Sequence, residues 1–390
     1  MIRRAAPTLL LAMAACRPLA APEPARSPEG ALVEVAPGEV PAFRDDLDLG
    51  GLEEAVGQSL VYVRRVLSAD PARTVGFGSA RVPLARVHAT LERFLEIVRS
   101  RPSPAQLDAA VRREFRVLRS IGDGRGTVLF TGYYLPELRG ALERGGPFQV
   151  PLHRAPDDLV TARARDFPQL SEDVVGRVEG GRLLPYPTRA EIANGALHGK
   201  RAELLFVDSA VDAFFLEVQG SGIVRLPDGT ARVVTFAGKN GHRYAAVGAE
   251  LVRRGAMTRE ALSLQSIKAW LLANPSEQEA VLATNPSYVF FRFADAALGS
   301  IGVPVTAGRT IATDFRVYPK GALAFVASER AADETGSTFV PFSRFVLDQD
   351  TGGAIRTSER VDLFFGSGAY AESAAGRMRH PGALFYLLLR

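Results

Sequence analysis

Apolar side chains recur at helical spacing through the first third of the chain. The leucines and valines of residues 52–67 repeat every three or four positions, and so do the apolar residues of 84–98. This spacing predicts two amphipathic helices. A third helix is predicted to open at Ser103-Pro104, a capping residue followed by a first-turn proline, and to run through Leu118.

From residue 127 onward, short apolar runs alternate with glycine and proline turns. A capping box from Thr188 to Glu191 predicts one short helix among them, and Pro227-Asp228-Gly229 predicts a hairpin turn. Further helices are expected at 244–253, 264–272, 277–283 and 369–378. We expect strands at 127–134, 148–152, 203–207, 214–218, 223–226, 231–236, 288–293, 303–306, 310–312, 322–326, 342–347, 361–365 and 384–389. Many short strands with regular turns predict a mainly β fold that includes a barrel.

One predicted strand, at residues 361–365, carries an acid among apolar residues. On a strand, Asp362 shares a face with Arg360 and Phe364, while the residues between them point the other way. An acid beside an aromatic residue, just before a Gly-Ser-Gly turn, either lines a cleft or is a solvated acid on the wet face of the sheet. The strand pattern alone leaves both interpretations open.

The N-terminus is typical of an exported protein. Residues 1–16 comprise a short basic start, an apolar run too short to span a bilayer, and Cys16, the only cysteine of the chain. This segment resembles a bacterial lipoprotein signal, in which the cysteine becomes lipidated; a plain signal peptide is the alternative. Arg17, in place of aspartate, favours the periplasmic face of the outer membrane of a Gram-negative cell. Residues 17–41, rich in Pro, Ala and Glu, read as a linker.

Composition narrows the function classes. The chain has 390 residues and a formal net charge of +4, with both signs spread along its length. Without a basic block, nucleic acid is not an expected partner. The five histidines are isolated and no HExxH or Cys/His cluster occurs, so we expect no metal and no cofactor.

Several short motifs, in one fixed order, resemble the membrane-bound lytic murein transglycosylase A (MltA) family. They cover the chain from residue 127 to its end. The matching segments are Thr131 to Tyr134 (TGYY), Tyr186 to Arg189 (YPTR), Phe215 to Gly222 (FLEVQGSG), Ala237 to His242 (AGKNGH), Asn285 to Phe291, and Asp350 to Ile355 with Val361-Asp362. The C-terminal part resembles the family's "3D" domain, whose three aspartates match Asp314, Asp350 and Asp362.

The resemblance implies a fold of two β-barrel domains with a groove between them for a glycan strand. Residues 42–134 and 298–390 would form a double-psi β-barrel, the catalytic domain. Residues 135–297 would form an inserted second β-barrel domain.

The resemblance also implies the chemistry. The family cleaves the β-1,4 bond between N-acetylmuramic acid and N-acetylglucosamine in peptidoglycan without water and leaves 1,6-anhydro ends. Asp362 matches the family's catalytic acid. A neutral carboxyl, favoured by burial and by apolar neighbours such as Phe364, would protonate the leaving oxygen and then, as carboxylate, accept the proton of the attacking C6 hydroxyl.

Other positions follow from the matched motifs. Asp350, Gly352, Gly353 and Ala354 are candidates for positioning the substrate or supporting the acid. The groove candidates, each with an equally acceptable structural role, are Thr131, Tyr133, Gln219 and Lys239. Asp314 is expected to brace a barrel turn. Glu217, expected on one strand face with Gln219, is a weaker candidate for a second carboxylate.

Three other functions compete with this one. Asp350-Thr351-Gly352 is similar to the Asp-Thr-Gly of aspartic proteases, but those enzymes need two such loops and the chain has one. A cell-wall polysaccharide-binding protein without activity, and a hydrolase of the same bond, remain alternatives. Expected partners are glycan strands, a membrane reached through the lipid anchor, and cell-wall synthesis or hydrolysis complexes. The sequence leaves endo or exo cleavage, peptide-stem preference and oligomeric state open.

Overall fold

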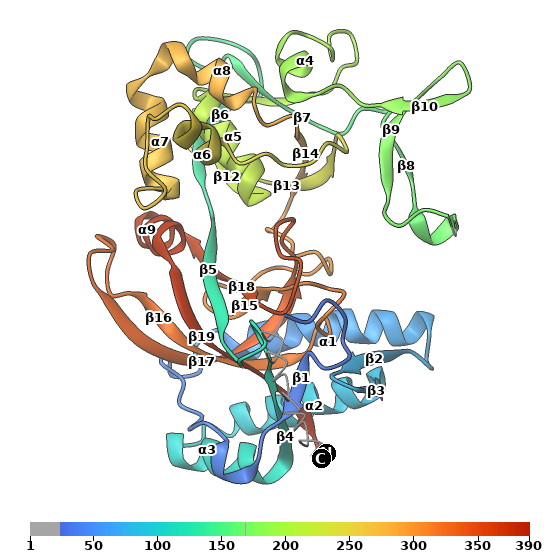
Figure 1. Cartoon of the computed structure of the whole chain (residues 1–390), viewed down its shortest axis with the longest axis vertical. Helices are drawn as coiled ribbons and strands as arrows, with labels where there is room; N and C mark the ends of the chain where they lie inside the picture. The colour runs from blue at the N-terminus through green and yellow to red at the C-terminus, as the bar shows by residue number, and fades with distance from the viewer. Residues whose placement is uncertain (1–23, 168) are drawn as a thin grey trace, which may run out of the picture.

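The chain folds into two bodies, drawn one above the other in Figure 1. The computed structural model describes residues 24–167 and 169–390, so the predicted signal segment and Cys16 lie outside the described residues. The lower body contains both the N-terminal helices and the C-terminal strands, and β5 (Val128–Leu135) runs up from it toward the upper body. No described helix is both long enough and apolar enough to cross a membrane.

The lower body is built on a closed ring of six strands. The order is β5–β18–β15–β17–β16–β19, and β19 pairs back onto β5. The β5–β18 and β15–β17 pairs are parallel, and the other pairs in the ring are antiparallel. Besides β5, the ring comprises β15 (Thr310–Ala312), β16 (Leu323–Ala331), β17 (Phe339–Asp350), β18 (Arg360–Ser367) and β19 (Arg379–Leu389). The closed ring confirms the predicted barrel.

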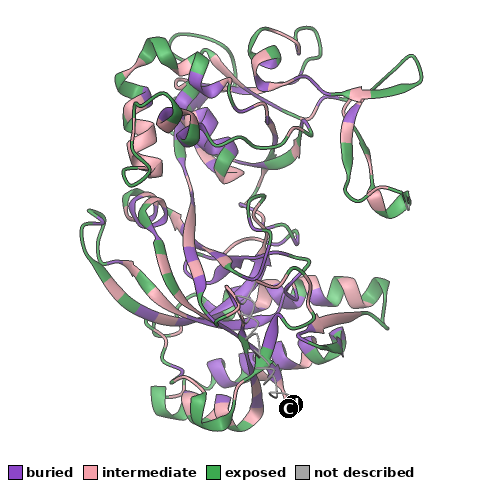
Figure 2. Cartoon of the chain, in the orientation of Figure 1, coloured by how far each residue is buried: buried purple, intermediate pink, exposed green. Residues whose placement is uncertain are grey.

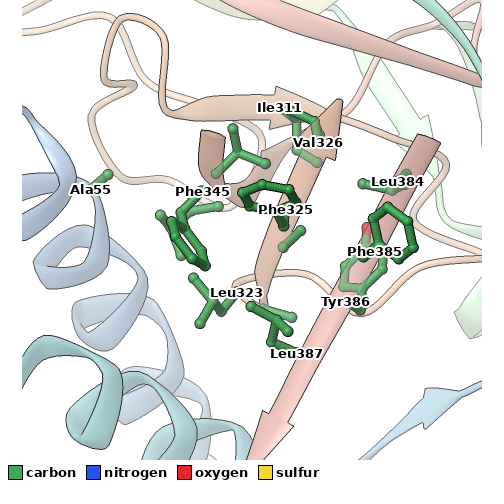
Figure 3. Packing of buried hydrophobic residues seen from close by; sticks show 14 of the residues in the cluster. Ala55, Ile311, Leu323, Phe325, Val326, Phe345, Leu384, Phe385, Tyr386 and Leu387 are labelled. Atoms are coloured by element: carbon green, nitrogen blue, oxygen red, sulfur yellow. The ribbon is translucent and has the colours of Figure 1, made fainter. Parts of the chain in front are cut away.

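Helices and short strands cover this barrel. They are β1 (Leu32–Glu34), η1 (Pro37–Glu39), α1 (Leu52–Ala69), β2 (Thr74–Phe77), β3 (Ala80–Pro83), α2 (Leu84–Arg99), α3 (Pro104–Glu114), β4 (Phe115–Ser120) and α9 (Ala369–Arg377). The main hydrophobic core lies between the barrel and these helices. Figure 3 shows its centre, where the rings of Phe325 and Phe345 lie edge to face with their centroids 5.0 Å apart. The ring of Phe94 in α2 also packs on Phe345, with a centroid distance of 4.8 Å. Aromatic packing of this kind fixes the helices on the barrel.

The upper body has its own six-stranded sheet, ordered β14–β13–β12–β6–β11–β7. Its edge strands β14 and β7 lie close together, so the sheet curls toward closure. The strands are β6 (Glu137–Ala141), β7 (Val150–His153), β11 (Glu203–Val207), β12 (Ser221–Arg225), β13 (Ala231–Lys239) and β14 (Val289–Ala294). The helices are α4 (Arg189–Ala193), α5 (Ala210–Gln219), α6 (Val247–Arg253), α7 (Leu264–Ala273), η3 (Pro275–Glu277) and α8 (Gln278–Leu282).

A separate three-stranded sheet forms an arm that extends from the upper body in Figure 1. It consists of β8 (Val160–Ala162), β9 (Val174–Glu179) and β10 (Arg182–Pro185), with η2 (Ala164–Asp166) in the β8–β9 connection. In Figure 2 the arm is mostly exposed, whereas buried residues concentrate in the two larger sheets. The sequence pattern did not predict these strands.

Several predicted elements are wrong. Residues 214–218 are not a strand: they belong to helix α5, which begins after the capping Ser209 and ends at Gly220 with φ 81°. Leu118 lies in β4 and not in the third helix, and 303–306 form no strand. Part of the predicted linker is also structured, since Leu32–Glu34 pairs with β4 as β1 and Ala31 is fully buried.

The other predicted elements, and the fold class, are confirmed. The capping boxes at Ser103 and Thr188 open α3 and α4 as expected. The Pro227-Asp228-Gly229 turn joins the antiparallel strands β12 and β13. The molecule is mainly β with peripheral helices. The domain limits given above stay a prediction, although the chain leaves the ring after β5 and rejoins it at β15.

Candidate active site

Asp362 lies in β18, which pairs with one strand on each side. The register pairs it with Thr131 of β5 and with Ala312 of β15. The Thr131 hydroxyl donates to Asp362 Oδ1. Arg360, on the same face of β18, forms a two-bonded ion pair in which Nε lies 2.9 Å from Oδ1 and Nη2 lies 3.1 Å from Oδ2. Both oxygens of a partly buried carboxylate therefore accept hydrogen bonds.

A second acid, Asp350, ends β17 and is half-buried. Its Oδ1 accepts the backbone N–H groups of Ser300 at 2.9 Å and Thr351 at 2.8 Å. Burial outweighs these bonds and raises the pKa of Asp350. Tyr133 is its neighbour: burial, together with the Asp350 carboxyl, raises the pKa of that phenol well above its usual range. The Tyr133 oxygen completes no hydrogen bond to any residue that the structure describes.

Tyr133 also links Asp350 to the strand of Asp362. Its ring packs 5.0 Å from that of Phe364, and the two residues are register partners across the β5–β18 pair. Because Phe364 follows Asp362 on the same face, the apolar neighbour predicted for the acid is present. The sequence did not predict that Arg360 would also pair with this acid.

The glycine-rich segment after Asp350 approaches the site at one residue. A Cβ on Gly352 would lie 3.7 Å from Asp362 Oδ2 and only 2.8 Å from Ile355 Cδ1. A side chain at this position would displace Ile355, and glycine lets the backbone come this close without that shift. Gly353 and Ala354 are exposed, and a Cβ on Gly353 would meet nothing within 4 Å. These two residues remain candidates for contacting a substrate.

Gln219 and Lys239 come from the upper body and differ in their surroundings. Gln219 ends α5, and its side-chain oxygen accepts the backbone N–H of Tyr134 at 3.1 Å, which ties the upper body to β5. Lys239 ends β13 and is exposed. Their predicted role in a groove stays a prediction.

Glu217 has a structural role that the sequence did not indicate. It lies in α5 and accepts both Nη groups of Arg189, at 2.9 and 2.7 Å, with 5% of its side chain exposed. Arg189 also donates to the carbonyls of Asn285 and Ser287 and lies over the ring of Phe214, 4.8 Å from its centroid. The YPTR, FLEVQGSG and NPSY motifs therefore meet at a buried ion pair that holds the upper body together.

Two further acids of the barrel are engaged elsewhere. Asp314 is buried and accepts the Arg316 guanidinium at 2.7 and 3.0 Å just after β15, as expected of a residue that braces a turn. Asp348, which the sequence did not single out, pairs at 2.6 Å with the ammonium of Lys320, which also donates to the carbonyl of Asp350. A buried acid in a long strand is the signal that marks such an ion pair.

Family comparisons agree with this architecture. Residues 129–292 match the MltA specific insert domain, and residues 309–388 match the 3D domain. Membrane-bound lytic murein transglycosylase A of Vibrio cholerae is 35% identical over 272 residues, which cover 68% of this chain and 67% of that protein. The Escherichia coli protein of the same name is 33% identical over 271 residues, with the same two coverages.

Solved structures resemble the whole fold. A membrane-bound lytic murein transglycosylase from Agrobacterium tumefaciens has a TM-score of 0.76 and 29% identity, covering 92% of this chain and 98% of that one. Escherichia coli MltA with bound chitohexaose has a TM-score of 0.70 and 26% identity, covering 94% and 96%.

Fold, site and relatives together define the class: the protein is a peptidoglycan-cleaving enzyme, a lytic murein transglycosylase. Within that class, the chain belongs to the membrane-bound lytic murein transglycosylase A family, as the sequence motifs predicted.

Proposed function

We propose that this enzyme cleaves the β-1,4 bond between N-acetylmuramic acid and N-acetylglucosamine without water and leaves a 1,6-anhydro end. Asp362 acts as the single acid and base. The observation that carries this proposal is its setting: a side chain that is 13% exposed, on a barrel strand, bonded to Thr131 of β5 and followed on the same face by the buried Phe364.

The reaction balances with one carboxyl. Protonated Asp362 gives its proton to the glycosidic oxygen as the bond from that oxygen to C1 breaks. The resulting carboxylate takes the proton of the C6 hydroxyl of the same muramic acid, and O6 forms the new bond to C1. Asp362 ends protonated again, and no water is consumed. The nucleophile belongs to the substrate, so its effective concentration is high.

The other nearby acids support a one-carboxylate mechanism. A hydrolase needs a second carboxylate to activate water or to attack the sugar. Asp350 uses one oxygen to accept two backbone N–H groups, and its burial raises its pKa. Asp348 pairs with Lys320, and Glu217 pairs with Arg189. Each of these acids has a structural partner that competes with such a role.

The substrate and the location follow by analogy with relatives. A glycan strand as ligand is supported by the chitohexaose bound to the Escherichia coli structure. The relatives are named membrane-bound. We propose that Cys16 supplies a lipid anchor at the outer membrane, that the segment after it gives reach into the periplasm, and that cell-wall synthesis or hydrolysis complexes recruit the enzyme.

A matched pair of variants tests the role of Asp362. Asp362→Asn keeps the shape of the side chain and removes the transferable proton, so turnover of purified peptidoglycan should fall about 100-fold or more, with melting temperature and sacculus binding retained. Glu359→Gln is the control, because Glu359 is an exposed acid of the same segment. Retained turnover in Asp362→Asn would move the acid elsewhere. Binding to sacculi without any cleavage by the wild type would favour a binding module.

A further inference from the structure

The ion pair on β18 conflicts with the first step of the proposed reaction. Asp362 Oδ1 accepts from Thr131 and from Arg360 Nε, and Oδ2 accepts from Arg360 Nη2. A protonated carboxyl must place its hydrogen on one of these oxygens, where a donor already points. The arrangement therefore favours the carboxylate, whereas the reaction begins with the carboxyl protonated.

One partner in this pair can leave more easily than the other. Asp362 belongs to a strand paired on both sides, and its side chain is 13% exposed, whereas the Arg360 side chain is 34% exposed. Within the described residues, the Arg360 guanidinium donates only to Asp362 and to the Thr131 hydroxyl.

Fixed arginines of this protein look different. Arg309 pairs with Asp45 at 0% and 2% exposure and also donates to the carbonyls of Gly50 and Phe345. Arg189 donates to two backbone carbonyls in the same way. Arg360 has no such backbone anchor in the described structure, so it is the mobile member of its pair.

We propose that Arg360 is a positioning residue that couples the proton state of Asp362 to occupancy of the site. With no glycan, its guanidinium holds Asp362 as a carboxylate. When an N-acetylated glycan enters, it excludes water and offers carbonyl oxygens to the guanidinium, which gives up Asp362. The freed carboxylate then takes up a proton and becomes the acid. This inference rests on the proposed function and adds a step before it.

Other charged groups lie on the elements packed around β18, and substitution of Arg360 leaves each of them in place. Among the described residues, the half-buried Asp350 has no ion-pair partner, and the Tyr133 phenol stays neutral because burial raises its pKa. The others are the Asp348–Lys320 pair of the barrel interior, the Asp314–Arg316 pair after β15, Arg379 of β19, and Arg356 and Glu359 in the segment before β18. Because these groups are unchanged in the variants, the loss of the positive Arg360 partner has one sign: it removes a group that favours the carboxylate of Asp362.

Two pH profiles test the coupling, with soluble uncrosslinked peptidoglycan oligomers as substrate. The profile of kcat/KM reports the free enzyme and that of kcat reports the complex. In the wild type, the alkaline limb of kcat/KM should lie at lower pH than that of kcat, because the guanidinium holds the carboxylate only while the site is empty. In Arg360→Gln, the kcat/KM limb should move up to meet the kcat limb.

Two more variants complete the design. Arg360→Lys keeps the charge but loses the planar fork, so its kcat/KM limb should lie between the other two. Arg356→Gln removes an exposed arginine four residues away and should reproduce the wild type. Melting temperatures will establish whether each variant is folded. If Arg360→Gln does not fold, Arg360→Lys provides the test.

The outcomes separate the two claims. A wild type that releases no anhydro product would refute the proposed function and this inference with it. An active wild type, with folded Arg360 variants whose kcat/KM limb stays in place, would refute the coupling alone.

Discussion

Breaking the Arg189–Glu217 pair should destabilise the upper body strongly and non-additively. The pair has two hydrogen bonds, and its side chains are 11% and 5% exposed. Burial raises the pKa of Glu217, so desolvation is already severe with the arginine present. Removal of one partner leaves a buried charge unpaired, which costs about 3–5 kcal/mol.

The structure also ranks the two single variants. Arg189→Ala orphans Glu217, removes the donor to the carbonyls of Asn285 and Ser287, and exposes the face of Phe214. Glu217→Ala leaves Arg189 its two carbonyls. Arg189→Ala should therefore be the more damaging. The double variant leaves no unpaired charge, so it should cost about 3 kcal/mol less than the sum of the singles.

A double-mutant cycle by urea unfolding measures this coupling. Trp270, the one tryptophan of the chain, lies in α7 and packs against the same cluster as Phe214, so its fluorescence reports the upper body. The exposed pair Arg225–Glu137, in the same body, is the control and should couple by less than about 1 kcal/mol. Additive effects for Arg189 and Glu217 would contradict the structural role given to this pair.

Three further predictions concern stability. Burial lowers the pKa of His153 to about 4, so the fold favours the neutral imidazole. As the pH falls from 6.5 to 4, the wild type should therefore lose up to about 3 kcal/mol of its free energy of unfolding, measured with urea. The variant His153→Gln should not show this loss. An equal loss in both would refute this assignment. Burial raises the pKa of Asp350, so the charged carboxylate destabilises the fold at neutral pH. Asp350→Asn removes the charge, and its oxygen can still accept both backbone N–H groups, so it should raise the melting temperature at neutral pH; the difference should vanish below about pH 4. A lower melting temperature at neutral pH would contradict this prediction. A Cβ on Gly132 would lie 2.6 Å from Ala375 Cα, so Gly132→Ala should push α9 away from β5 and cost about 1–3 kcal/mol of stability. Gly353→Ala is the control and should be neutral, because a Cβ there would meet nothing within 4 Å. Equal melting temperatures for the two variants would refute the clash.

Much of the barrel was predictable because its strands carry their own signals. The alternation at 361–365 correctly placed Val361, Leu363 and Phe365 on the core face of β18, although Phe364, on the face of Asp362, is buried as well. Residues 214–218 misled because a mostly buried helix segment has the same apolar run as a strand; the cap at Ser209 marks the helix. The arm strands were missed because they pack against no core.

The candidate site was predictable in part. The motifs pointed to Asp362, and the β5–β18 register does bring Thr131 to it. Contacts between distant segments could not be read from spacing: Glu217 meets Arg189, 28 residues earlier, and Gln219 meets Tyr134, 85 residues earlier. Such pairs depend on how the sheets close. The match of several motifs to one family indicated that they were important, but not that most of them build the upper body.

The most direct test of the central claim is digestion of purified peptidoglycan in H₂¹⁸O by the protein without residues 1–16, followed by mass spectrometry of the released muropeptides. We predict 1,6-anhydro ends, one water lighter than reducing ends and free of ¹⁸O, and their absence with Asp362→Asn. Reducing ends that carry ¹⁸O would contradict the account, because water would then be the nucleophile and a second carboxylate would be required.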